Sequence, residues 1–458
     1  MCHSASSLKD LTKGSVPVSL AKLTAPMVMG VSSSILVQTL EMGFIGQLST
    51  QHVAAITFTF PLAMVLTSIA LGISIGTSSV IARSVGSGED ADVTKLATHS
   101  LMLVAGLMLI LSVFGWLIID PLFTALGARQ ESLPLIHSYL DIYLPGTVLF
   151  TMTMIGSSIM RANGSATIPG VVMTIGAFFN LLIDPVLIFG WFGVPRLELA
   201  GAATAMTITR VFTTGVIFYF VYRGQMLQTH KIFEDFVSSS RRILQIGLPA
   251  MATQLIGPVT AALITSMLAR HGETVVAGFG VASRIEAVAA MMLFALSGSI
   301  GPFVGQNWGA KQVKRVSDGV KASYQFSLGW GFIAAIPLYF FGATIAGWID
   351  DSPTVIGVAA FYLSLVPWGY GLWGVLMMAS ASFNALGKPL PSTALSFMRM
   401  FVIYLPLAML LNNAYGYKGI FMATLVSNVL LGIIAWLWFR IRLANMTKKS
   451  WEGNYAKE

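Results

Sequence analysis

Twelve apolar runs, each long enough to cross a lipid bilayer, constrain the fold of this chain more than any other feature. A membrane-spanning helix needs about 20 mostly apolar residues. Charged residues make up only 10% of the 458 residues, against about 25% in a typical soluble domain. The sequence therefore predicts an all-α integral membrane protein with twelve transmembrane helices. The runs lie at 23–45, 53–82, 96–120, 134–160, 168–191, 199–222, 243–269, 276–305, 322–346, 354–383, 391–412 and 419–439.

The Lys and Arg residues between these runs fall mainly on one side of the membrane. If the N-terminus is cytoplasmic, the inside segments hold 20 basic residues and the outside segments hold four, namely Arg129, Arg196, Arg270 and Lys418. Cytoplasmic loops carry an excess of Lys and Arg. We therefore expect both termini in the cytoplasm. The net charge of +8 then reports topology and gives no reason to expect a nucleic-acid partner.

The chain contains one architectural unit twice. "KLTAP", which ends at Pro26, matches "QIGLP", which ends at Pro249, and the two positions differ by 223. Gly86 and Gly309, in the loops after the second and eighth runs, have the same separation. A constant offset between several anchors is the signature of a repeat. Each copy has six spans, so we expect two pseudo-symmetric six-helix bundles related by an axis along the membrane normal, with substrate sites between them.

The repeat also gives boundaries for the parts of the chain. We expect an N-terminal lobe at 1–222, a cytoplasmic linker at 223–242, a C-terminal lobe at 243–443 and a cytoplasmic tail at 444–458. The linker "RGQMLQTHKIFEDFVSSSRR" mixes basic and apolar residues. This composition favours a segment that is partly an amphipathic helix on the membrane surface.

An acid and a proline lie inside the apolar stretch "FFNLLIDPVLIFG" at 178–190. An ionisable group at membrane depth is costly and is by default a functional residue. Asn180 precedes Asp184 by four residues, so the two share a helix face. Pro185 removes a backbone donor and frees the carbonyl of Leu181. We predict a kinked, polar site that faces the interior of the bundle.

The first apolar run supplies a second acid. Glu41 follows Lys22 by 19 residues, about 28 Å of helix, and Gln38 lies on the same face. We expect Glu41 and the acid at position 184 to share a water-accessible pocket in the outer half of one bundle. Burial and like charge both favour the neutral form of a carboxylic acid, so such a pair can bind and release a proton. Protonation can then change the first helix, in which Pro26 is the predicted hinge.

Two other interpretations of the acids stay open at this point. They could simply hydrogen-bond neighbouring helices. They could also bind Na⁺ together with Asn180 and a hydroxyl of Thr204 or Thr207, because hard cations prefer oxygen ligands.

The second copy of the unit does not repeat the two acids. Ile264 occupies the position equivalent to Glu41, and Leu407 occupies the position equivalent to Asp184. A purely structural requirement of the fold would tend to appear in both copies. The acids therefore point to chemistry that is peculiar to the first copy.

Four further charges lie within the predicted spans, namely Arg210, Arg284, Glu286 and Arg399. Ions inside a membrane usually pair with one another, so we expect structural roles for Arg210 and Arg399 and a buried pair between Glu286 and Arg399. Arg284 and Glu286 differ by two positions and point to different faces of their helix. They are candidates for a substrate or cation cavity.

The sequence gives no clear sign of an enzyme. It contains no HExxH pattern and no cluster of metal-ligating residues, and its single cysteine, Cys2, rules out a disulfide framework. We therefore expect no catalytic residue, no resident metal and no cofactor. The even, duplicated arrangement of spans argues against a membrane-embedded enzyme or a channel.

Over nearly its whole length the chain resembles the MATE (multidrug and toxic compound extrusion) transporters. The resemblance rests on the two six-span halves, on Pro26 in the first span and on "LVQTLEMGFIGQL" at its outer end. It also rests on "RANG" and "NALGKP" after the fourth and tenth spans, on "NLLIDP" in the fifth and on "LAGAATA" at the start of the sixth. The Asn and Asp-Pro of the fifth span are similar to the DinF-like branch, in which proton coupling is placed in the N-terminal lobe.

The resemblance implies a V-shaped pair of lobes that works by alternating access. It implies export of small organic, often cationic, compounds against inward H⁺ or Na⁺ flow, by a monomer among the lipids of the bacterial inner membrane. Asp184, Asn180 and Glu41 would be the coupling residues and Pro26 the bend. The family acid in the first span is usually Asp, and Met206 stands where a threonine is common; both departures favour H⁺ over Na⁺. The alternatives are a Na⁺-coupled MATE exporter and a lipid-linked sugar flippase of the same superfamily.

Overall fold

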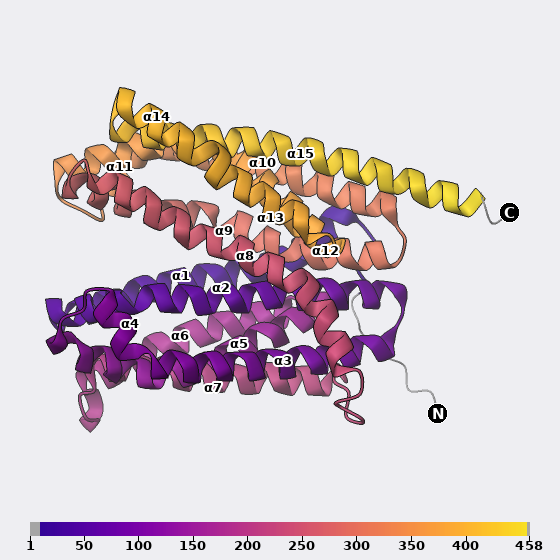
Figure 1. Cartoon of the computed structure of the whole chain (residues 1–458), viewed down its shortest axis with the longest axis horizontal. Coiled ribbons are helices and arrows are strands. Elements are labelled where there is room, and N and C mark those ends of the chain that lie inside the picture. The colour runs from indigo at the N-terminus through magenta and orange to yellow at the C-terminus, as the bar shows by residue number, and fades with distance from the viewer. Residues whose placement is uncertain (1–9, 456–458) are drawn as a thin grey trace. The chain divides into compact units, whose positions relative to one another are not determined.

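The computed structural model describes residues 10–455, with side chains up to Met446, and the regular secondary structure in this range is helical (Figure 1). Within that range, twelve helices or joined helices are long and apolar enough to cross a membrane. This confirms the predicted all-α class and number of spans. Cys2 and the last residues of the predicted tail lie outside the described residues.

Fifteen α-helices make up the described part of the chain, and their order follows the predicted spans. They are α1 Val16–Gly46, α2 Thr50–Ser87, α3 Asp90–Leu117, α4 Ile119–Ala125, α5 Leu133–Ala162, α6 Thr167–Phe189, α7 Glu198–Arg223, α8 Phe236–Ala269, α9 Glu273–Gly309, α10 Val313–Ala346, α11 Pro353–Leu365, α12 Tyr370–Ala385, α13 Pro389–Phe397, α14 Leu405–Tyr415 and α15 Tyr417–Tyr455.

Two of the predicted spans consist of joined helices. The tenth span contains α11 and α12, linked by the 3₁₀ segment η3 at Val366–Gly369, where Pro367 cannot donate a backbone hydrogen bond. The eleventh contains α13 and α14, linked by the π-helical segment η4 at Met398–Tyr404. Two short 3₁₀ turns, η1 Gln130–Ser132 and η2 Trp191–Gly193, precede α5 and α7.

The helices form two compact units. The first unit contains residues 25–255, and in it α5 packs against α2, α3 and α7, while α6 packs against α7. The second unit contains Leu11–Thr24 and the chain from Ile256 onward, and in it α12 packs against α9, α10 and α15. Relative to the predicted lobes, the start of α1 belongs to the second unit and the start of α8 to the first.

Glycines allow close helix contacts in the first unit. A Cβ atom on Gly76 of α2 would lie 2.5 Å from the carbonyl oxygen of Ile243 in α8. A Cβ atom on Gly170 of α6 would lie 2.3 Å from the carbonyl oxygen of Pro26 in α1. Both distances are far below van der Waals contact, so only glycine fits at these crossings. Small residues at helix interfaces are the usual means of tight packing in membranes.

The segment before α8 and the first turns of α8 are each joined to α3 by one ion pair. Lys95 contacts Asp235 at 2.7 Å, and Arg242 contacts Asp92 through bonds of 2.8 and 2.9 Å. The hydrogen bond from Lys95 holds the pKa of Asp235 below its ordinary value. Helix α8 begins at Phe236, so the second part of the predicted linker is the start of a spanning helix.

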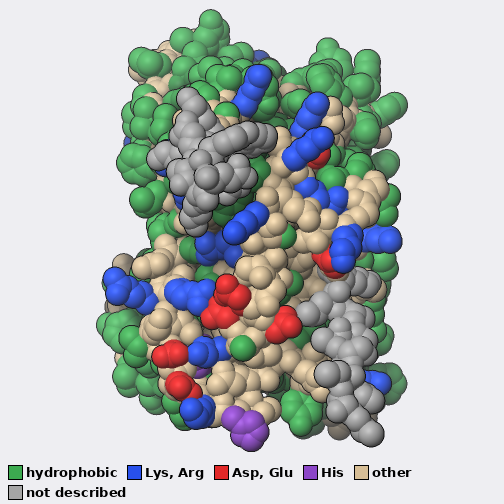
Figure 2. Space-filling view, turned by 90° about the vertical axis from the view of Figure 1, so that its right-hand side faces the viewer, with side chains coloured by type: hydrophobic (Ala, Val, Ile, Leu, Met, Phe, Trp, Pro, Cys, Tyr) green, Lys and Arg blue, Asp and Glu red, His purple; other side chains and the backbone are tan. Residues whose placement is uncertain are grey.

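The second unit fixes its own leading segment in a different way. Arg315, near the start of α10, donates hydrogen bonds of 2.6–3.2 Å to the backbone carbonyls of Leu11, Lys13 and Gly14. The backbone N–H of Leu11 in turn donates to the side chain of Gln306 at 3.0 Å. Figure 2 looks onto one set of helix ends and shows Lys and Arg side chains gathered there.

Candidate functional site: a buried acidic cluster in the first unit

Asp184 and Asn180 form the centre of the site on α6. The carboxyl of Asp184 has no solvent exposure, and Asn180 is 5% exposed. The side-chain amide of Asn180 donates to Oδ2 of Asp184 over 2.7 Å, as their spacing of one helical turn predicts. The other oxygen of each side chain, Oδ1 of Asp184 and Oδ1 of Asn180, is buried without a hydrogen-bond partner. Such orphaned oxygens are costly and call for a proton or a cation.

Helix α6 continues through the proline that follows the acid. The helix runs without interruption from Thr167 to Phe189, and Pro185 is buried within it. Its C-terminus is closed by Gly190 in the left-handed conformation, at φ 78°. The site therefore lies in the last three turns of a continuous helix.

Glu41 of α1 is the second acid of the cluster. It is 7% exposed, and it interacts electrostatically both with Asp184 and with the guanidinium of Arg210 on α7. The sequence predicted a shared pocket for Glu41 and Asp184; in the structure both acids are buried and interact electrostatically. The electrostatic interaction with Arg210 was not predicted, because Arg210 was assigned a structural role.

Arg210 is itself held by aromatic and backbone groups of α5. Its guanidinium lies 4.7 Å from the ring centre of Tyr143 and 5.3 Å from that of Phe150. It also donates to the carbonyl of Tyr143 at 3.4 Å. Within the described residues no carboxylate lies within salt-bridge distance of Arg210. The cation therefore lies at the edge of the acidic cluster without neutralising either acid by direct contact.

Tyr139 of α5 completes the cluster and was missed by the sequence analysis. It is 6% exposed, stacks on Tyr143 with ring centres 5.3 Å apart, and interacts electrostatically with both Glu41 and Asp184. An aromatic residue in an apolar run is usually part of the packed core, so the sequence around Tyr139 did not indicate that it lies near the acids. One signal was available: the repeat offset of 223 pairs Tyr139 with a second tyrosine, Tyr362.

Other predicted site residues of the first unit lie apart from this cluster's polar contacts. Gln38 is exposed. The hydroxyl of Thr204 donates back to Ala200 of its own helix at 2.7 Å, and that of Thr207 faces the carbonyl of Ile142 in α5 at 3.5 Å. The α1 helix runs unbroken through the predicted hinge, Pro26. Both hydroxyls donate to backbone carbonyls, and the oxygen lone pairs of each stay available to a ligand.

The second unit holds the remaining predicted charges. Glu286 of α9 accepts a hydrogen bond from the hydroxyl of Tyr362 in α11. Arg399, in the π-helical segment, interacts electrostatically with Glu286 and donates to Asn428 of α15 at 3.3 Å. The predicted Glu286–Arg399 pair is thus an electrostatic neighbourhood in which each partner hydrogen-bonds a third group. Arg284 is exposed on the same helix as Glu286.

The cluster has the composition of a proton or small-cation site. Among the described residues there is no group of three or more His, Cys, Asp or Glu side chains that could hold a transition metal. Two carboxylates, one amide and a tyrosine offer only oxygen and amide groups. They can hold a proton, and in oxygen chemistry they are compatible with a hard monovalent cation.

A family model decides the relationship of the chain to known proteins. The model of the MatE family matches residues 26–186 and again residues 249–410, one match in each half. The chain belongs to the MATE family. Members of this family handle small organic substrates and couple their movement to ions, so this MATE protein is a multi-pass membrane transporter. The two matched segments begin at Pro26 and Pro249, the anchors of the internal repeat.

Individual relatives give a mixed picture of the cargo. This MATE protein is 34% identical over 416 residues to the FAD transporter of Shewanella oneidensis, which covers 90% of this chain and 92% of that protein. It is 24% identical over 429 residues to the multidrug export protein MepA of Staphylococcus aureus, covering 93% and 94%. The solved structure of the Vibrio cholerae MATE transporter VcmN in the bent form matches with a TM-score of 0.89 and 30% identity, covering 94% and 97%.

Proposed function

We propose that this MATE protein is a secondary exporter driven by inward proton flow, with Asp184 as the proton-binding group. The observation that carries the proposal is the state of Asp184. It is fully buried, it has one hydrogen bond from Asn180, and its second oxygen has no partner. A buried charge in this state is unfavourable, and one proton relieves it.

Glu41 and Tyr139 give the proton a route to conformational change. Glu41 is on α1 and interacts with Asp184 on α6, so the charge of one acid affects the packing of two helices. A proton can drive transport only if the two access states bind it with different affinity. We propose that protonation of the cluster changes α1 at Pro26, as in the DinF-like branch, and lowers the affinity for cargo on the outer side.

The cargo has two candidates. Organic cations follow from the relationship to multidrug exporters such as MepA. FAD follows from the higher identity to the S. oneidensis FAD transporter, 34% against 24%. Arg284, an exposed cation on α9, favours an anionic cargo such as a dinucleotide. We propose export across a bacterial plasma membrane by a monomer with both termini in the cytoplasm.

Reconstituted vesicles with separately imposed gradients test the proposal. Purified protein in liposomes is given either a pH gradient or a Na⁺ gradient, and movement of ethidium or FAD is followed by their fluorescence. The pH gradient alone is expected to drive transport, and Asp184→Asn is expected to abolish that dependence. Transport that follows the Na⁺ gradient alone, or a pH-driven Asp184→Asn variant, would overturn proton coupling at this residue.

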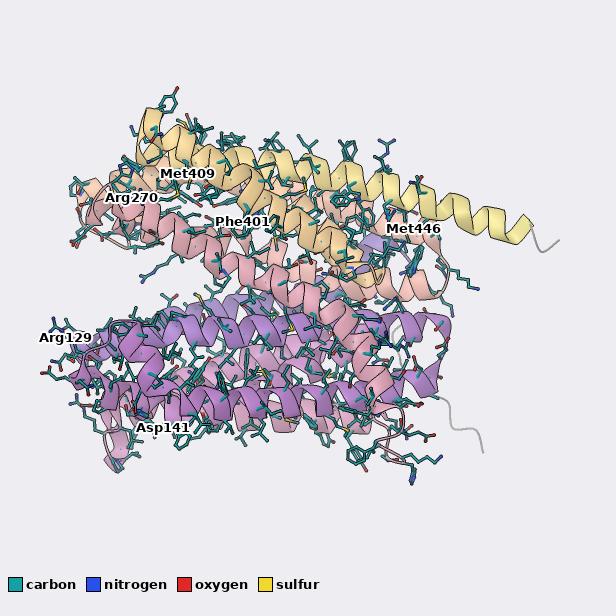
Figure 3. All side chains as sticks on the ribbon, in the orientation of Figure 1. Arg129, Asp141, Arg270, Phe401, Met409 and Met446 are labelled. Atoms are coloured by element: carbon teal, nitrogen blue, oxygen red, sulfur yellow. The ribbon has the colours of Figure 1, made fainter. Side chains whose placement is uncertain are left out.

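Asp141 provides the matched control. It lies on α5 in the same unit, at its outer surface (Figure 3), with a side chain that is 48% exposed and hydrogen-bonded to Trp116. Asp141→Asn removes the same charge without touching the cluster, and its transport should keep the dependence on pH.

A further inference from the structure

The second unit contains a groove that the transport proposal does not use. It has a volume of about 1660 Å³ and lies between α10 and α15. Residues of α12, which packs against both of these helices, also line it. Drug-sized ligands occupy sites of roughly 300–1,000 Å³, so this groove suits a larger molecule. All of its lining residues belong to the second unit.

The mouth of the groove is basic. Lys314 and Lys321 of α10 and Arg440 of α15 line it, with Asp318 as the acid among them. The two lysines and Asp318 recur at intervals of three or four residues and so share one helix face. All four side chains are exposed. No hydrogen bond or ion pair within the described residues engages the two lysines.

A neighbouring arginine does not belong to this set. Arg315 also lines the groove, but its guanidinium is already bound by the backbone carbonyls of Leu11, Lys13 and Gly14. The positive charge available to a ligand therefore comes from Lys311, Lys314, Lys321 and Arg440.

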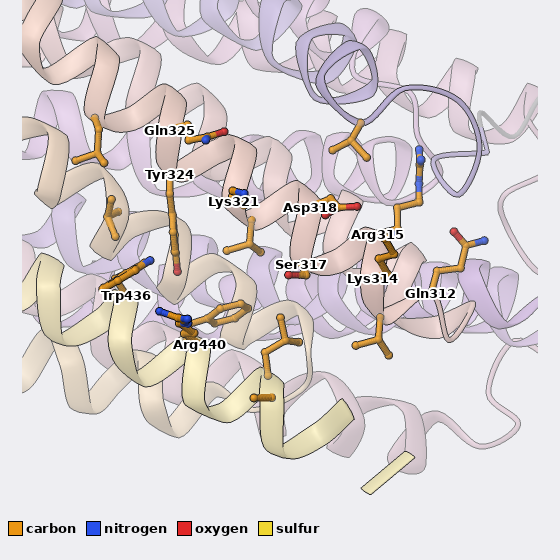
Figure 4. Close-up of a pocket in the computed structure, with 18 of the residues that line it drawn as sticks. Gln312, Lys314, Arg315, Ser317, Asp318, Lys321, Tyr324, Gln325, Trp436 and Arg440 are labelled. Atoms are coloured by element: carbon orange, nitrogen blue, oxygen red, sulfur yellow. The ribbon is translucent and has the colours of Figure 1, made fainter. Parts of the chain in front are cut away.

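The middle of the groove carries an unsatisfied polar group. Tyr324 is 8% exposed, and its hydroxyl is buried without a hydrogen-bond partner. Figure 4 shows Tyr324 extending from α10 toward Trp436 and Arg440 of α15. Its ring packs edge-on against Phe439, with centres 6.5 Å apart, which fixes the direction of the hydroxyl. Buried tyrosine hydroxyls normally find a partner, so this one marks the place of a ligand acceptor.

The other end of the groove, toward Leu328, is apolar. Leu328 of α10, Leu372 and Val375 of α12 and Ile433 of α15 line it. Leu328 follows Lys321 by seven residues, which is about 10 Å along the helix. Trp436 lies between the two ends, 42% exposed, with the guanidinium of Arg440 at 5.7 Å from its ring. Tryptophan at the boundary between charged and apolar zones is typical of the membrane interface.

We propose that this groove binds one anionic phospholipid, with its phosphate at Lys321, Arg440 and the hydroxyl of Tyr324 and its acyl chains along Leu328 and Ile433. The basic end of the groove, the hydroxyl of Tyr324 and the apolar end follow one another along α10. The headgroup, the phosphate ester and the acyl chains of a phospholipid follow one another in the same order. The groove opens at the helix ends that the distribution of Lys and Arg assigns to the cytoplasm. Basic pockets between transmembrane helices on that side suit acidic headgroups.

Native mass spectrometry of the purified protein in detergent provides the test. Dioleoyl phosphatidylglycerol and dioleoyl phosphatidylcholine are titrated in parallel, and the populations of lipid adducts give apparent affinities. Each Lys or Arg near a lipid surface contributes about fivefold, so Lys321→Gln with Arg440→Gln should weaken phosphatidylglycerol binding about 25-fold. The same double variant should leave phosphatidylcholine binding nearly unchanged.

Arg442→Gln is the matched control, because Arg442 is exposed on α15, two residues from Arg440, and does not line the groove. Its phosphatidylglycerol affinity should equal that of the wild type. An equal loss in Arg442→Gln and in the double variant would mean diffuse attraction to a basic surface and would overturn the site.

Tyr324→Phe is the milder second variant. It should weaken phosphatidylglycerol binding about 2- to 12-fold, the weight of one hydrogen bond. Its thermal unfolding in lipid-free detergent should not be lowered, because the hydroxyl has no protein partner to lose. Unchanged lipid affinity, or a lowered unfolding temperature without lipid, would contradict a ligand role for the hydroxyl.

A soluble competitor separates a lipid from a free anion. Inorganic phosphate and glycerol 3-phosphate at millimolar concentration should displace little phosphatidylglycerol, because neither has an acyl chain to contact the apolar end of the groove. Complete displacement by either would assign the groove to a soluble anion and overturn the lipid. None of these readouts uses transport, so they are independent of the proposed function.

Discussion

The two units of this MATE protein are built on one repeat but differ in where they keep their acids. In the first unit Glu41 and Asp184 lie on its first and fifth spans. At the equivalent positions the second unit has Ile264 and Leu407, which pack in or against its hydrophobic core. Apolar side chains therefore replace the two acids at the equivalent positions of the second unit.

The tyrosine between these positions is kept in both units. Tyr139 and Tyr362 are related by the repeat offset of 223, and both are buried. Tyr139 interacts with Glu41 and Asp184, whereas Tyr362 donates to Glu286, an acid on a different span. The scaffold thus provides the same phenol twice, and each unit brings a carboxylate to it from a different helix. The comparison teaches that duplication conserved the polar position while the acid chemistry diverged.

Asp184→Asn and Glu286→Gln, tested side by side, should show the largest difference between the units. Allosteric coupling energies correspond to roughly 5- to 150-fold changes in affinity, and Asp184→Asn should remove this factor from proton-driven export. Glu286→Gln should keep the dependence on the pH gradient and change only the KM for cargo. Initial rates in liposomes at several imposed gradients measure both. Loss of pH dependence in Glu286→Gln alone would reverse the assignment of the units.

Tyr362→Phe should destabilise the second unit more than Tyr139→Phe destabilises the first. Removal of a hydrogen bond to an ionisable group leaves Glu286 without its donor and should cost roughly 1.5–3 kcal/mol. Tyr139 is stacked on Tyr143, and that contact survives in Tyr139→Phe. Thermal unfolding in detergent compares the two variants. Equal losses would indicate that Tyr139 has a hydrogen bond as strong as that of Tyr362.

Gly170→Ala should lower stability in the first unit, whereas its repeat counterpart should tolerate change. The added Cβ would lie 2.3 Å from the carbonyl oxygen of Pro26, and overpacking of this kind costs about 1–3 kcal/mol. Thr393, 223 positions later, already carries a Cβ atom, so Thr393→Ala adds no atom to its helix crossing and should cost less than Gly170→Ala. Unfolding temperatures of the two variants give the comparison. An unchanged Gly170→Ala protein would mean that α1 moves away from α6 without cost.

The smallest effect is expected at the segment that leads into α8. The hydrogen bond from Lys95 depresses the pKa of Asp235, so this contact stabilises the folded state above the unfolded pKa, about 3.9. The stabilisation is lost as the pH falls through the depressed folded value. Hydrogen exchange of residues 224–235 should therefore rise on acidification in the wild type and be already raised in Asp235→Asn. The Arg315 contacts of the second unit involve no acid and should show no such change.

High salt should weaken the Lys95–Asp235 ion pair and leave the hydrogen bonds of Arg315 to backbone carbonyls less affected. The Lys95–Asp235 pair is exposed, and salt screens exposed pairs. A pH response that persists unchanged at high salt would contradict an ion pair as its cause.

The sequence predicted the parts of the site that lie on one helix. Asn180 and Asp184 are one turn apart, and helical spacing alone places them on one face, as their hydrogen bond shows. The electrostatic interaction between Glu41 and Asp184 could be expected from the sequence, because both acids should avoid lipid. Contacts between helices were harder to predict. The neighbours of Arg210 and Tyr139 depend on how α5 and α7 are rotated, and an apolar run contains no signal for rotation.

The groove of the second unit was hidden for a related reason. Lys321 and Arg440 look like ordinary basic residues of cytoplasmic loops, and Tyr324 looks like core. Only the packing of α10 and α15 on α12 shows that these residues border one space. The π-helical turn at Arg399 was likewise not predicted.

Two helices are divided between the units, and this division has a mechanical consequence. The α1 helix passes from the second unit to the first between Thr24 and Ala25, beside Pro26, and α8 passes from the first to the second between Leu255 and Ile256. A rotation of one unit against the other would therefore change backbone torsion angles near these two junctions. Pro26 lies beside one of these junctions and has no backbone N–H, so the helix lacks one hydrogen bond close to the point where α1 leaves the second unit.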